Sequence, residues 1–403
     1  MSLTLLLDLD DTLLNTNLHA FMPAYFQALT DHVCGHVSSE KFMYALIGGV
    51  NCMNDNEDPR RALREVFEDY FYPALGLPKG ELQDVLEDFY DREFPKLASH
   101  TTRMPGAREL IEWASKSNVR VAIANDPLFP AKATHHRLRW AGFEPEQFEL
   151  VSAFEDFHFT KSRPAYYAEV LGRLGWREGP LLMAGNDVHR DILPAQRLGL
   201  KTFFVGRELA SHLDGAAGSG SLADLRRWLD SADPSALEPD YKSRDATLAT
   251  LLSTPAVLPT LIQPLTDVDC RHEPTRDDWA MIEIVCHLRD TEREVHALQV
   301  DLMLDKDDAF IPRPDAGVWA SERDYLHEDP AAALKEFGAA RVALLDKVKN
   351  MPDEIWDRKV RHAIFGPSNF SEVLSFAADH DRLHIQQAWK TLRSLADKRV
   401  QSI

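Results

Sequence analysis

The sequence predicts two folds in one chain: an α/β domain with a parallel β-sheet over residues 1–230 and an all-α four-helix bundle over residues 246–403. In the first part, short apolar runs alternate with amphipathic segments, which is the pattern of a parallel sheet with helices on both faces. In the second part this alternation stops and long helical patterns follow one another, as in a helix bundle. A chain of 403 residues is long enough for two or three domains.

The predicted strands of the first part are short and bounded by polar or glycine residues. They are Leu3–Leu7, Val119–Ala124, Leu181–Ala184 and Thr202–Val205. Amphipathic helices are predicted between them at Ala107–Ser115, Ala165–Leu174 and Ile192–Leu198. Residues 15–100 break the alternation, because they are nearly all helical in pattern and follow the first strand directly. We therefore expect a helical insertion there.

A polar, proline-containing segment at residues 231–245 predicts a linker between the two parts. The glycine- and serine-rich stretch at 215–221 predicts a loop, or alternatively the linker itself. Asp329 and Pro330 supply an N-cap and a proline at the first helical position for the third long helix. The four long helices are predicted at 246–265, 277–304, 330–350 and 370–397.

The composition narrows the class of partner. A net charge of −19 argues against nucleic-acid binding, because phosphate recognition needs clustered positive charge. No apolar run approaches the roughly 20 residues of a membrane helix, and the N-terminal run stops at Asp8 without a basic leader, so we expect neither a membrane partner nor a signal peptide. The cysteines form no CxxC pair, which favours reduced thiols and a cytoplasmic protein. They are Cys34, Cys52, Cys270 and Cys286.

Polar side chains follow the predicted strands, at the sheet edge where ligands bind in open α/β folds. Carboxylates that converge there repel one another, and such a cluster is tolerable with a divalent cation and a lysine. Asp8, Asp187 and a backbone carbonyl are oxygen donors that suit Mg²⁺. The predicted magnesium site comprises Asp8, Asp10, Asp187 and Asp191. This arrangement favours phosphoryl transfer through a carboxylate nucleophile. The residues in question are Asp8, Asp10, Asn125, Lys161, Asp187 and Asp191.

Four motifs in this order resemble the haloacid dehalogenase (HAD) superfamily over residues 1–230. They are DLDDT at the end of the first strand, a polar residue at a strand end, a lysine shortly before a proline, and GND-x3-D. The resemblance implies a Rossmann-like core in which the insertion at 15–100 forms a cap that covers the active site and selects the leaving group. A lid of this kind excludes water and favours a small, freely diffusing substrate.

The resemblance also implies a role for each motif residue. Asp8 would be the nucleophile, and Asp10 would protonate the leaving oxygen and then activate water. Lys161 would hold the nucleophile and the phosphoryl oxygens. Asp187 would bind Mg²⁺, and Asp191 would support the waters of the metal. The presence of Asp10 favours phosphatase chemistry, because dehalogenating members differ at this position.

Asn125 departs from the pattern, because the superfamily has Ser or Thr at this strand end. Its amide can still donate a hydrogen bond, but it is bulkier and also carries an acceptor. We therefore expect Asn125 to take part in phosphoryl binding with reduced activity; the alternative is a retained fold with a weakened site. The aromatic residues of the insertion are expected to form mainly cap core. They are Phe21, Tyr25, Phe26, Phe67, Tyr70, Phe71, Phe89 and Tyr90.

Three histidines of the second part form a candidate metal site. His380 and His384 are four residues apart on a predicted helix and share one face. His287 lies on the second long helix, and three imidazoles would leave one coordination position open, as in catalytic zinc sites. No Glu follows His380, so the metalloprotease motif does not apply. The alternative is that these histidines are simply packed or hydrogen-bonded.

A histidine on the second helix, HxxxH on the fourth and the stretch GVWASERDYL resemble the DinB-like superfamily over about residues 245–398. The resemblance implies a helical bundle with a three-histidine metal site, and some members are thiol-dependent transferases or isomerases. Imidazole ligands suit Zn, Ni, Fe or Mn. Glu292 and Gln387 would either support the ligands or have interhelical or surface polar roles.

These observations lead to one leading hypothesis and two alternatives. The leading one is a Mg²⁺-dependent phosphatase that acts on a small-molecule phosphate ester through an aspartyl phosphate, fused to a metal-binding bundle. The second places the main chemistry in the bundle, as a metal- and thiol-dependent transferase or isomerase with an accessory HAD domain. The third is a non-enzymatic ligand-binding scaffold. A homodimer through the bundle at 245–403 is compatible with all three.

Overall fold

A computed structural model describes residues 2–206, 215–275 and 278–401 of the chain. The chain divides into two compact units. The first contains Met1–Glu57, Arg61–Val170 and Glu178–Asp240, and the second contains Asp58–Arg60, Leu171–Arg177 and Tyr241–Ile403.

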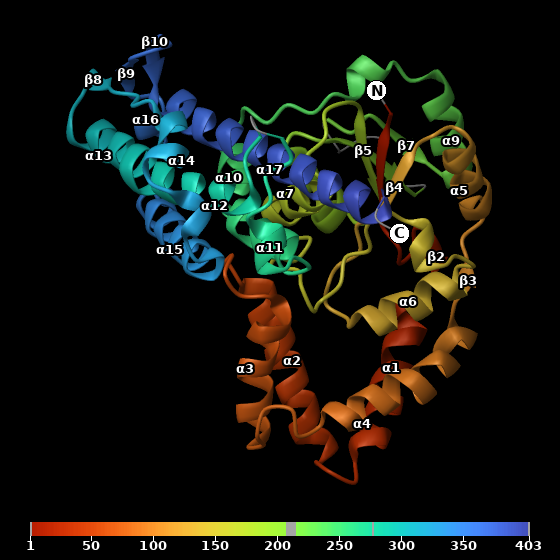
Figure 1. Cartoon of the computed structure of the whole chain (residues 1–403). Coiled ribbons are helices and arrows are strands. Elements are labelled where there is room, and N and C mark those ends of the chain that lie inside the picture. Colours follow the sequence, from red (N-terminus) through yellow and green to blue (C-terminus); the bar gives the residue numbers. More distant parts are fainter. Residues whose placement is uncertain (1, 207–214, 276–277, 402–403) are drawn as a thin grey trace. The chain divides into compact units, whose positions relative to one another are not determined.

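The first unit is built on a five-stranded parallel sheet with strand order β4-β1-β5-β6-β7 (Figure 1). The strands are β1 (Thr4–Leu7), β4 (Arg120–Ile123), β5 (Leu181–Gly185), β6 (Lys201–Val205) and β7 (Gly218–Gly220). β1, β4, β5 and β6 confirm the four strands predicted from the sequence. β7 corrects the loop predicted at 215–221, because Gly218 and Gly220 pair with Phe203 and Val205 of β6 despite their low strand propensity. The parallel sheet confirms the predicted Rossmann-like fold class.

Helices follow the strands of this sheet, and their apolar faces bury its core. They are α5 (Ala107–Lys116), α6 (Ala131–Trp140), α7 (Pro164–Arg173), α8 (Leu193–Arg197) and α9 (Leu222–Ser231), with short π or 3₁₀ turns at Val188–Ile192, Pro145–Gln147 and Pro234–Leu237. β1 is buried along its whole length, as its apolar sequence predicts for a central parallel strand. Leu5, Leu7, Leu110 and Leu182 are fully buried in this core.

The helical insertion leaves and re-enters the sheet domain through a two-stranded antiparallel ribbon of β2 (Leu14–Asn15) and β3 (Thr102–Arg103). Between these strands lie the helices coloured red to orange in Figure 1. They are α1 (Leu18–Val33), α2 (Ser39–Asp55), α3 (Leu63–Leu75), α4 (Gln83–Asp88), a π turn at Phe89–Glu93 and a 3₁₀ segment at Phe94–His100. Phe21, Phe71 and Phe89 are buried in the core of this insertion, as expected for cap-core residues.

The second unit is mainly helical. Its helices are α10 (Arg244–Ile262), α11 (Asp267–Cys270), α12 (Met281–Thr291), α13 (Ala297–Asp305), α14 (Trp319–Glu322), α15 (Pro330–Val348), α16 (Asp353–Trp356) and α17 (Phe370–Gln401), with 3₁₀ turns at Ala316–Val318 and Tyr325–His327. A π-helical turn, Glu292–His296, joins α12 to α13. α10, α12–α13, α15 and α17 correspond to the four predicted helices, except that residues 276–277 lie outside the described ones.

A small sheet with strand order β10-β9-β8 accompanies these helices, which the all-α expectation did not include. Its strands are β8 (Ala309–Ile311), β9 (Lys359–His362) and β10 (Gly366–Asn369). They are too short to give a sequence pattern, and Ile311 and Val360 are buried in the bundle core. α10 is the one helix of the described residues that is long and apolar enough to cross a membrane, and 72% of that stretch is buried inside the protein. A helix that is apolar all round is expected in the core of a bundle.

Candidate functional sites

The sheet of the first unit brings the predicted motif residues to one edge. β1 lies between β4 and β5, with Leu7 opposite both Ile123 and Ala184. The backbone N–H of Asp8 donates to the Ala184 carbonyl at 3.0 Å. Because all three strands are parallel, their carboxyl ends place Asp8, Asn125 and the loop after Gly185 beside one another.

Lys161 connects two of the predicted carboxylates. Its Nζ lies 2.6 Å from Asp8 Oδ1 and also forms an ion pair with Asp191. All three side chains are almost completely buried. Burial raises the pKa of the Asp8 carboxyl to about 7; the Asp191 carboxylate adds to this increase, while Lys161 opposes it. Although burial alone would lower the pKa of Lys161, Asp191 and Asp8 together raise it well above its ordinary value, so the lysine is a permanent cation in this site.

The GND-x3-D motif orders its own two carboxylates. The backbone N–H of Asp187 donates to Asp191 Oδ2 at 2.9 Å. Asp187 Oδ1 in turn accepts hydrogen bonds from the N–H groups of His189 and Arg190, at 2.8 and 3.1 Å. A Cβ atom at Gly185 would lie 2.2 Å from Asp191 Oδ2. Glycine is therefore required at 185, since any side chain would collide with the carboxylate that holds Lys161.

Asp10 is held by residues of the insertion base and of α6. Its carboxylate accepts a hydrogen bond from Thr16 Oγ1 at 2.8 Å and pairs with the guanidinium of Arg137. Arg137 is buried, and it belongs to none of the motifs that predicted this site. The Asn186 amide, oriented with its nitrogen toward these oxygens, donates to Asp8 Oδ2 at 3.3 Å and to the Asp10 carbonyl at 3.0 Å. Asn186 thereby joins the two segments that carry Asp8 and Asp187.

Asn125 is buried at the end of β4. Its side-chain Nδ2 donates to the backbone carbonyl of Asp126 at 3.3 Å. The backbone carbonyl of Asn125 accepts a hydrogen bond from the Tyr166 hydroxyl at 2.7 Å. The next carboxylate, Asp126, accepts from the backbone N–H of Lys161 at 3.3 Å and pairs with Arg190. These contacts fix the position of Asn125, and its role in phosphoryl binding stays a prediction.

The acidic cluster supplies an open set of donors for a cation. Among the described residues, no three of the four predicted carboxylates have donor atoms within 4.8 Å of one another. The reason is that Asp10 faces Arg137 and Asp191 faces Lys161. Asp8 and Asp187 remain at the edge as oxygen donors, together with backbone carbonyls. Oxygen donors fit a hard cation such as Mg²⁺, which keeps several waters rather than a closed protein cage.

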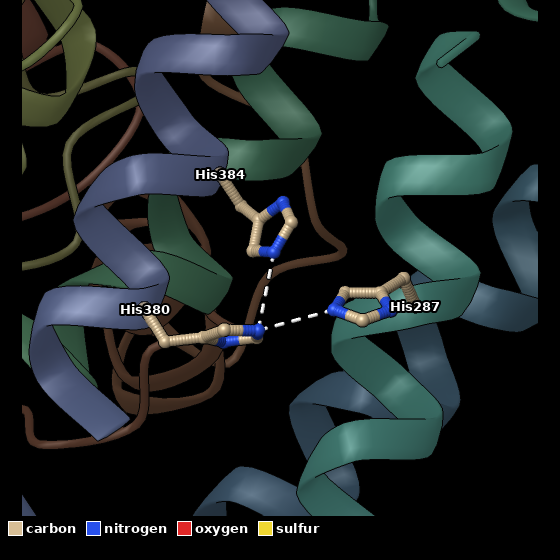
Figure 2. Close-up of side chains that lie close together, drawn as sticks. All are labelled: His287, His380 and His384. Atoms are coloured by element: carbon tan, nitrogen blue, oxygen red, sulfur yellow. Dashed lines mark hydrogen bonds between the residues drawn. The ribbon is translucent and has the colours of Figure 1, made fainter. Parts of the chain in front are cut away.

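The three predicted histidines of the second unit converge on one point (Figure 2). His380 Nε2 lies 3.0 Å from His287 Nε2 and 3.1 Å from His384 Nε2. His287 extends from α12, and the other two extend from adjacent turns of α17 (Figure 2). Their donor nitrogens all lie within 4.8 Å of one another. The structure therefore forms the three-imidazole cluster that the spacing predicted.

The electrostatic environment keeps these imidazoles neutral. Burial, reinforced by His384, lowers the pKa of His287 to about 3. Burial, with the neighbouring histidines, also lowers the pKa of His380 well below its ordinary value, and burial lowers the pKa of His384. A neutral imidazole has one nitrogen lone pair free, which is the form that binds a metal.

The surroundings of the cluster also fit a metal ligand set. His384 Nδ1 lies 2.8 Å from Gln387 Oε1, so that nitrogen carries the proton and Nε2 is left as the donor. His380 Nδ1 is buried without a hydrogen-bond partner among the described residues, whereas the backbone of Ala316 interacts with the His287 imidazole. Trp279 covers one side, with its ring stacked on His384 at 5.7 Å between centroids. Of the two predicted supporting residues, Gln387 contacts a histidine of the cluster.

Glu292 instead belongs to a buried ion network beside the cluster. Arg341 Nε and Nη2 donate to the two oxygens of Glu292 at 2.8 and 2.9 Å. Arg341 Nη1 and Nη2 donate to Asp381 at 2.5 and 3.1 Å. Burial alone would raise the pKa of Glu292, but Arg341 and His296 outweigh it and lower this pKa to about 2. The sequence left two roles open for Glu292, support of a metal ligand and an interhelical or surface polar contact. The contacts with Arg341 are of the interhelical kind.

His296 lies close to the cluster, although the sequence analysis did not include it. Its ring centroid is 5.5 Å from that of His380, and its Nδ1 lies 3.0 Å from Glu292 Oε2. His296 follows His287 by nine positions. In an ideal α-helix this separation would put the two side chains on about opposite faces. The π-helical turn Glu292–His296 changes this relation. Turns of this kind occur often at functional sites, but the apolar periodicity did not reveal this one.

Comparisons with known proteins agree with these two units. The family model of haloacid dehalogenase-like hydrolases matches residues 3–199, and that of the DinB superfamily matches residues 250–388. No curated protein matches the chain.

Several solved structures are similar to parts of the chain. A HAD phosphatase from Thermococcus onnurineus is 18% identical, with a TM-score of 0.38, over 57% of this chain and 98% of its own. A 2-haloacid dehalogenase from Pseudomonas syringae is 19% identical, with a TM-score of 0.43, over 57% of this chain and 99% of its own. YfiT from Bacillus subtilis, which has an unusual four-helix bundle topology, is 18% identical, with a TM-score of 0.36, over 39% of this chain and 90% of its own.

The family matches and the two folds lead to the same assignment. The chain carries a haloacid dehalogenase-like hydrolase domain at residues 3–199 and a DinB superfamily domain at residues 250–388.

Proposed function

We propose that the chain is a Mg²⁺-dependent phosphatase that hydrolyses a small phosphomonoester through an aspartyl phosphate at Asp8. The observation that carries this proposal is the contact of Lys161 with both Asp8 and Asp191 in a buried site at the edge of a parallel sheet. A carboxylate nucleophile held by a fixed cation is suited to attack on phosphorus. The presence of Asp10 supports phosphoryl transfer rather than dehalogenation.

The proposed reaction has two steps at the same carboxylate. In the first, an Asp8 oxygen forms a bond to phosphorus while the bond to the leaving oxygen breaks, and Asp10 gives its proton to that oxygen. In the second, Asp10 takes a proton from water, the water oxygen bonds to phosphorus, and inorganic phosphate leaves Asp8. Lys161 stays positively charged and contacts the oxygen of Asp8 throughout. Asp10 transfers one proton in each step, and both Asp8 and Asp10 return to their starting states only when the second step ends.

Asp8, Asp187 and backbone carbonyls would hold Mg²⁺ in this site. When bound, the cation supplies positive charge that neutralises the phosphoryl oxygens and favours the ionised form of Asp8. This charge matters here, because burial raises the pKa of Asp8 to about 7. Lys161 and the cation would together keep the nucleophile deprotonated.

The test is phosphate release from a set of phosphate esters by the full-length protein with Mg²⁺. We expect release by the wild type and none above background by Asp8→Asn, whose side chain is nearly isosteric. Chloride release from 2-chloropropionate serves as the competing assay, and we expect none. Undiminished phosphate release by Asp8→Asn, or chloride release in place of phosphate release, would contradict the proposal.

A second candidate function belongs to the histidine cluster. We infer that His287, His380 and His384 bind one transition metal with an open position and act as a metal-dependent transferase or isomerase that uses a small thiol. The three neutral imidazoles support it, since Zn, Ni, Fe and Mn all accept such ligands. Metal analysis of the purified full-length protein should give about one equivalent, and the His380→Ala variant should give almost none. Equal metal content in the wild type and His380→Ala would contradict a metal site at these histidines. Bound metal without turnover would favour a binding scaffold.

A further inference from the structure

The insertion and the sheet domain of the first unit line a large cavity, and the proposed mechanism gives its lining residues no role. Its volume is about 610 Å³, within the range of sites for drug-sized ligands. Helices of the insertion supply most of its wall. The remainder comes from residues 128–132 after β4 and from His135, Arg139, Phe154 and Glu155. A phosphoryl group and a few attached atoms would fill only a small part of this volume.

The wall of the cavity is mainly hydrocarbon and aromatic. Met22, Phe26, Leu46, Val50 and Phe67 all line it. These are residues of α1, α2 and α3, of which the sequence analysis assigned the aromatic ones mostly to cap core. Burying a hydroxyl-rich ligand against such a wall would leave its polar groups without partners, which is unfavourable. The lining therefore suits an apolar ligand.

Two tyrosines and most charged residues of the lining are paired with other groups of the protein. Tyr25 and Tyr90 hydrogen-bond to each other through their hydroxyls at 3.0 Å. Burial raises the pKa of Tyr25 to about 12, so this pair stays neutral. The charged side chains are paired as Arg64 with Glu68, Lys132 with Glu87, Arg139 with Glu144, and Glu155 with the backbone N–H of Ala131. These pairings neutralise the charged side chains named here, so they do not favour a charged ligand.

Phe129 connects the cavity to the proposed acid. Phe129 lines the cavity, and the guanidinium of Arg137 lies 4.5 Å from the centroid of its ring. Arg137 pairs with Asp10, which is the proposed proton donor to the leaving oxygen. A leaving group whose oxygen faces Asp10 would thus extend past Phe129 toward the cavity.

We propose that the cavity binds the leaving group of the substrate, and that this group is an uncharged alkyl or aromatic moiety rather than a sugar. The inference rests on the proposed phosphatase function for the reacting end of the substrate. It assigns the remainder of the substrate to a chemical class: monoesters of phosphate with an apolar alcohol or phenol.

The kinetic test uses n-propyl, n-hexyl and n-decyl phosphate with the full-length protein, and glucose 6-phosphate as the polar comparison. Each methylene that enters the cavity should raise kcat/KM by about fourfold, the factor that corresponds to burying one CH₂ group. The expected order is therefore decyl, hexyl, propyl and, last, glucose 6-phosphate. Phosphate release that is equal across the series, or fastest for glucose 6-phosphate, overturns the inference but leaves the phosphatase proposal intact.

A binding test separates the cavity from the chemistry. The uncharged fluorophore N-phenyl-1-naphthylamine should bind the wild type and Asp8→Asn equally. Leu46→Trp, which fills the cavity from α2, should weaken binding by about tenfold or more, whereas Tyr44→Trp on the same helix should change it by less than about twofold. Tyr44 is 66% exposed and does not line the cavity. Val50→Phe is the second filling variant, and circular dichroism melting verifies that each variant is folded.

The combined results distinguish the two failures. Probe binding that depends on Leu46 or Val50, without phosphate release from any ester, supports the apolar cavity and contradicts the phosphatase. No probe binding by the folded wild type, or equal binding by both filling variants, overturns the cavity inference whatever the phosphatase assay gives.

Discussion

Lys161 Nζ lies 2.6 Å from Asp8 Oδ1 and also pairs with Asp191, so one buried cation is shared by two buried carboxylates. The sharing explains how a sheet edge can hold this much negative charge. Without the lysine, Asp8 and Asp191 would repel each other in a site from which water is excluded. The lysine is therefore needed to assemble the site, and under the proposed function it would also stabilise charge during phosphoryl transfer.

Replacing Lys161 by methionine should lower kcat for phosphate release by about 10²- to 10³-fold, the usual loss when one preorganised electrostatic group is removed. The comparison variant is Lys116→Met, which removes an exposed lysine of α5 and should leave kcat unchanged. Steady-state kinetics on one ester measure both variants. A Lys161→Met enzyme with wild-type kcat would show that the lysine is only structural.

Gly185→Ala tests whether the glycine of the GND motif is required by packing. The added methyl group would lie 2.2 Å from Asp191 Oδ2, so the carboxylate must move away from Lys161. We expect the free energy of unfolding to fall by about 1–3 kcal/mol, as for other overpacked sites, and phosphate release to fall with it. Gly35→Ala is the control, because a Cβ atom at Gly35 meets nothing within 4 Å. Equal unfolding curves for wild type and Gly185→Ala would refute the steric argument.

The sequence predicts the acidic site because the sheet geometry leaves little choice. Residues that follow parallel strands must meet at one edge, so Asp8 and Asp187 could be placed together from strand patterns alone. Arg137 could not be predicted in the same way. It lies 127 positions from Asp10, and nothing in the helix that carries it distinguishes this arginine from Arg139. Only the packing of α6 onto the base of the insertion selects the buried one.

In the bundle, too, some site residues follow from the sequence pattern and others depend on the folded structure. The spacing of His380 and His384 fixes their common face, and the structure adds His287 as predicted. The proximity of His296 depends on a π-helical turn, which changes the helical phase without leaving a mark on apolar periodicity. The short strands β8 to β10 were missed because segments of three or four residues are below the length at which alternation can be recognised.

Gln387→Leu tests the hydrogen bond that orients His384. Removing the acceptor at 2.8 Å from Nδ1 frees the imidazole to rotate or to change tautomer. We expect metal affinity to fall by about 10- to 100-fold, the common effect of losing such a partner. Gln263→Leu, at an exposed position in the same unit, should bind metal like the wild type. Competition with a chromophoric chelator measures both affinities, and identical values would argue against an orienting role for Gln387.

The Arg341 network should make the stability of the bundle depend on pH through Glu292. The pKa of Glu292 is about 2 in the folded protein, against an ordinary value of 4.5. The unfolded chain therefore takes up the proton first as pH falls. Glu292 stabilises the fold fully above about pH 4.5 and loses this contribution between pH 4.5 and 2. The full difference corresponds to roughly 3 kcal/mol, at about 1.4 kcal/mol per tenfold change in proton affinity.

Urea unfolding of wild type and Glu292→Gln, followed by tryptophan fluorescence from pH 7 to 2.5, measures this contribution. Near neutral pH the variant should be less stable, because Arg341 keeps only one buried carboxylate partner, Asp381. The difference in unfolding free energy should stay constant above about pH 5 and shrink steadily below it, since protonation removes the same charge from the wild type. Glu322→Gln, at an exposed position on α14, should follow the wild type at every pH. A difference that persists unchanged down to pH 2.5 would mean that Glu292 acts through packing and not through its charge.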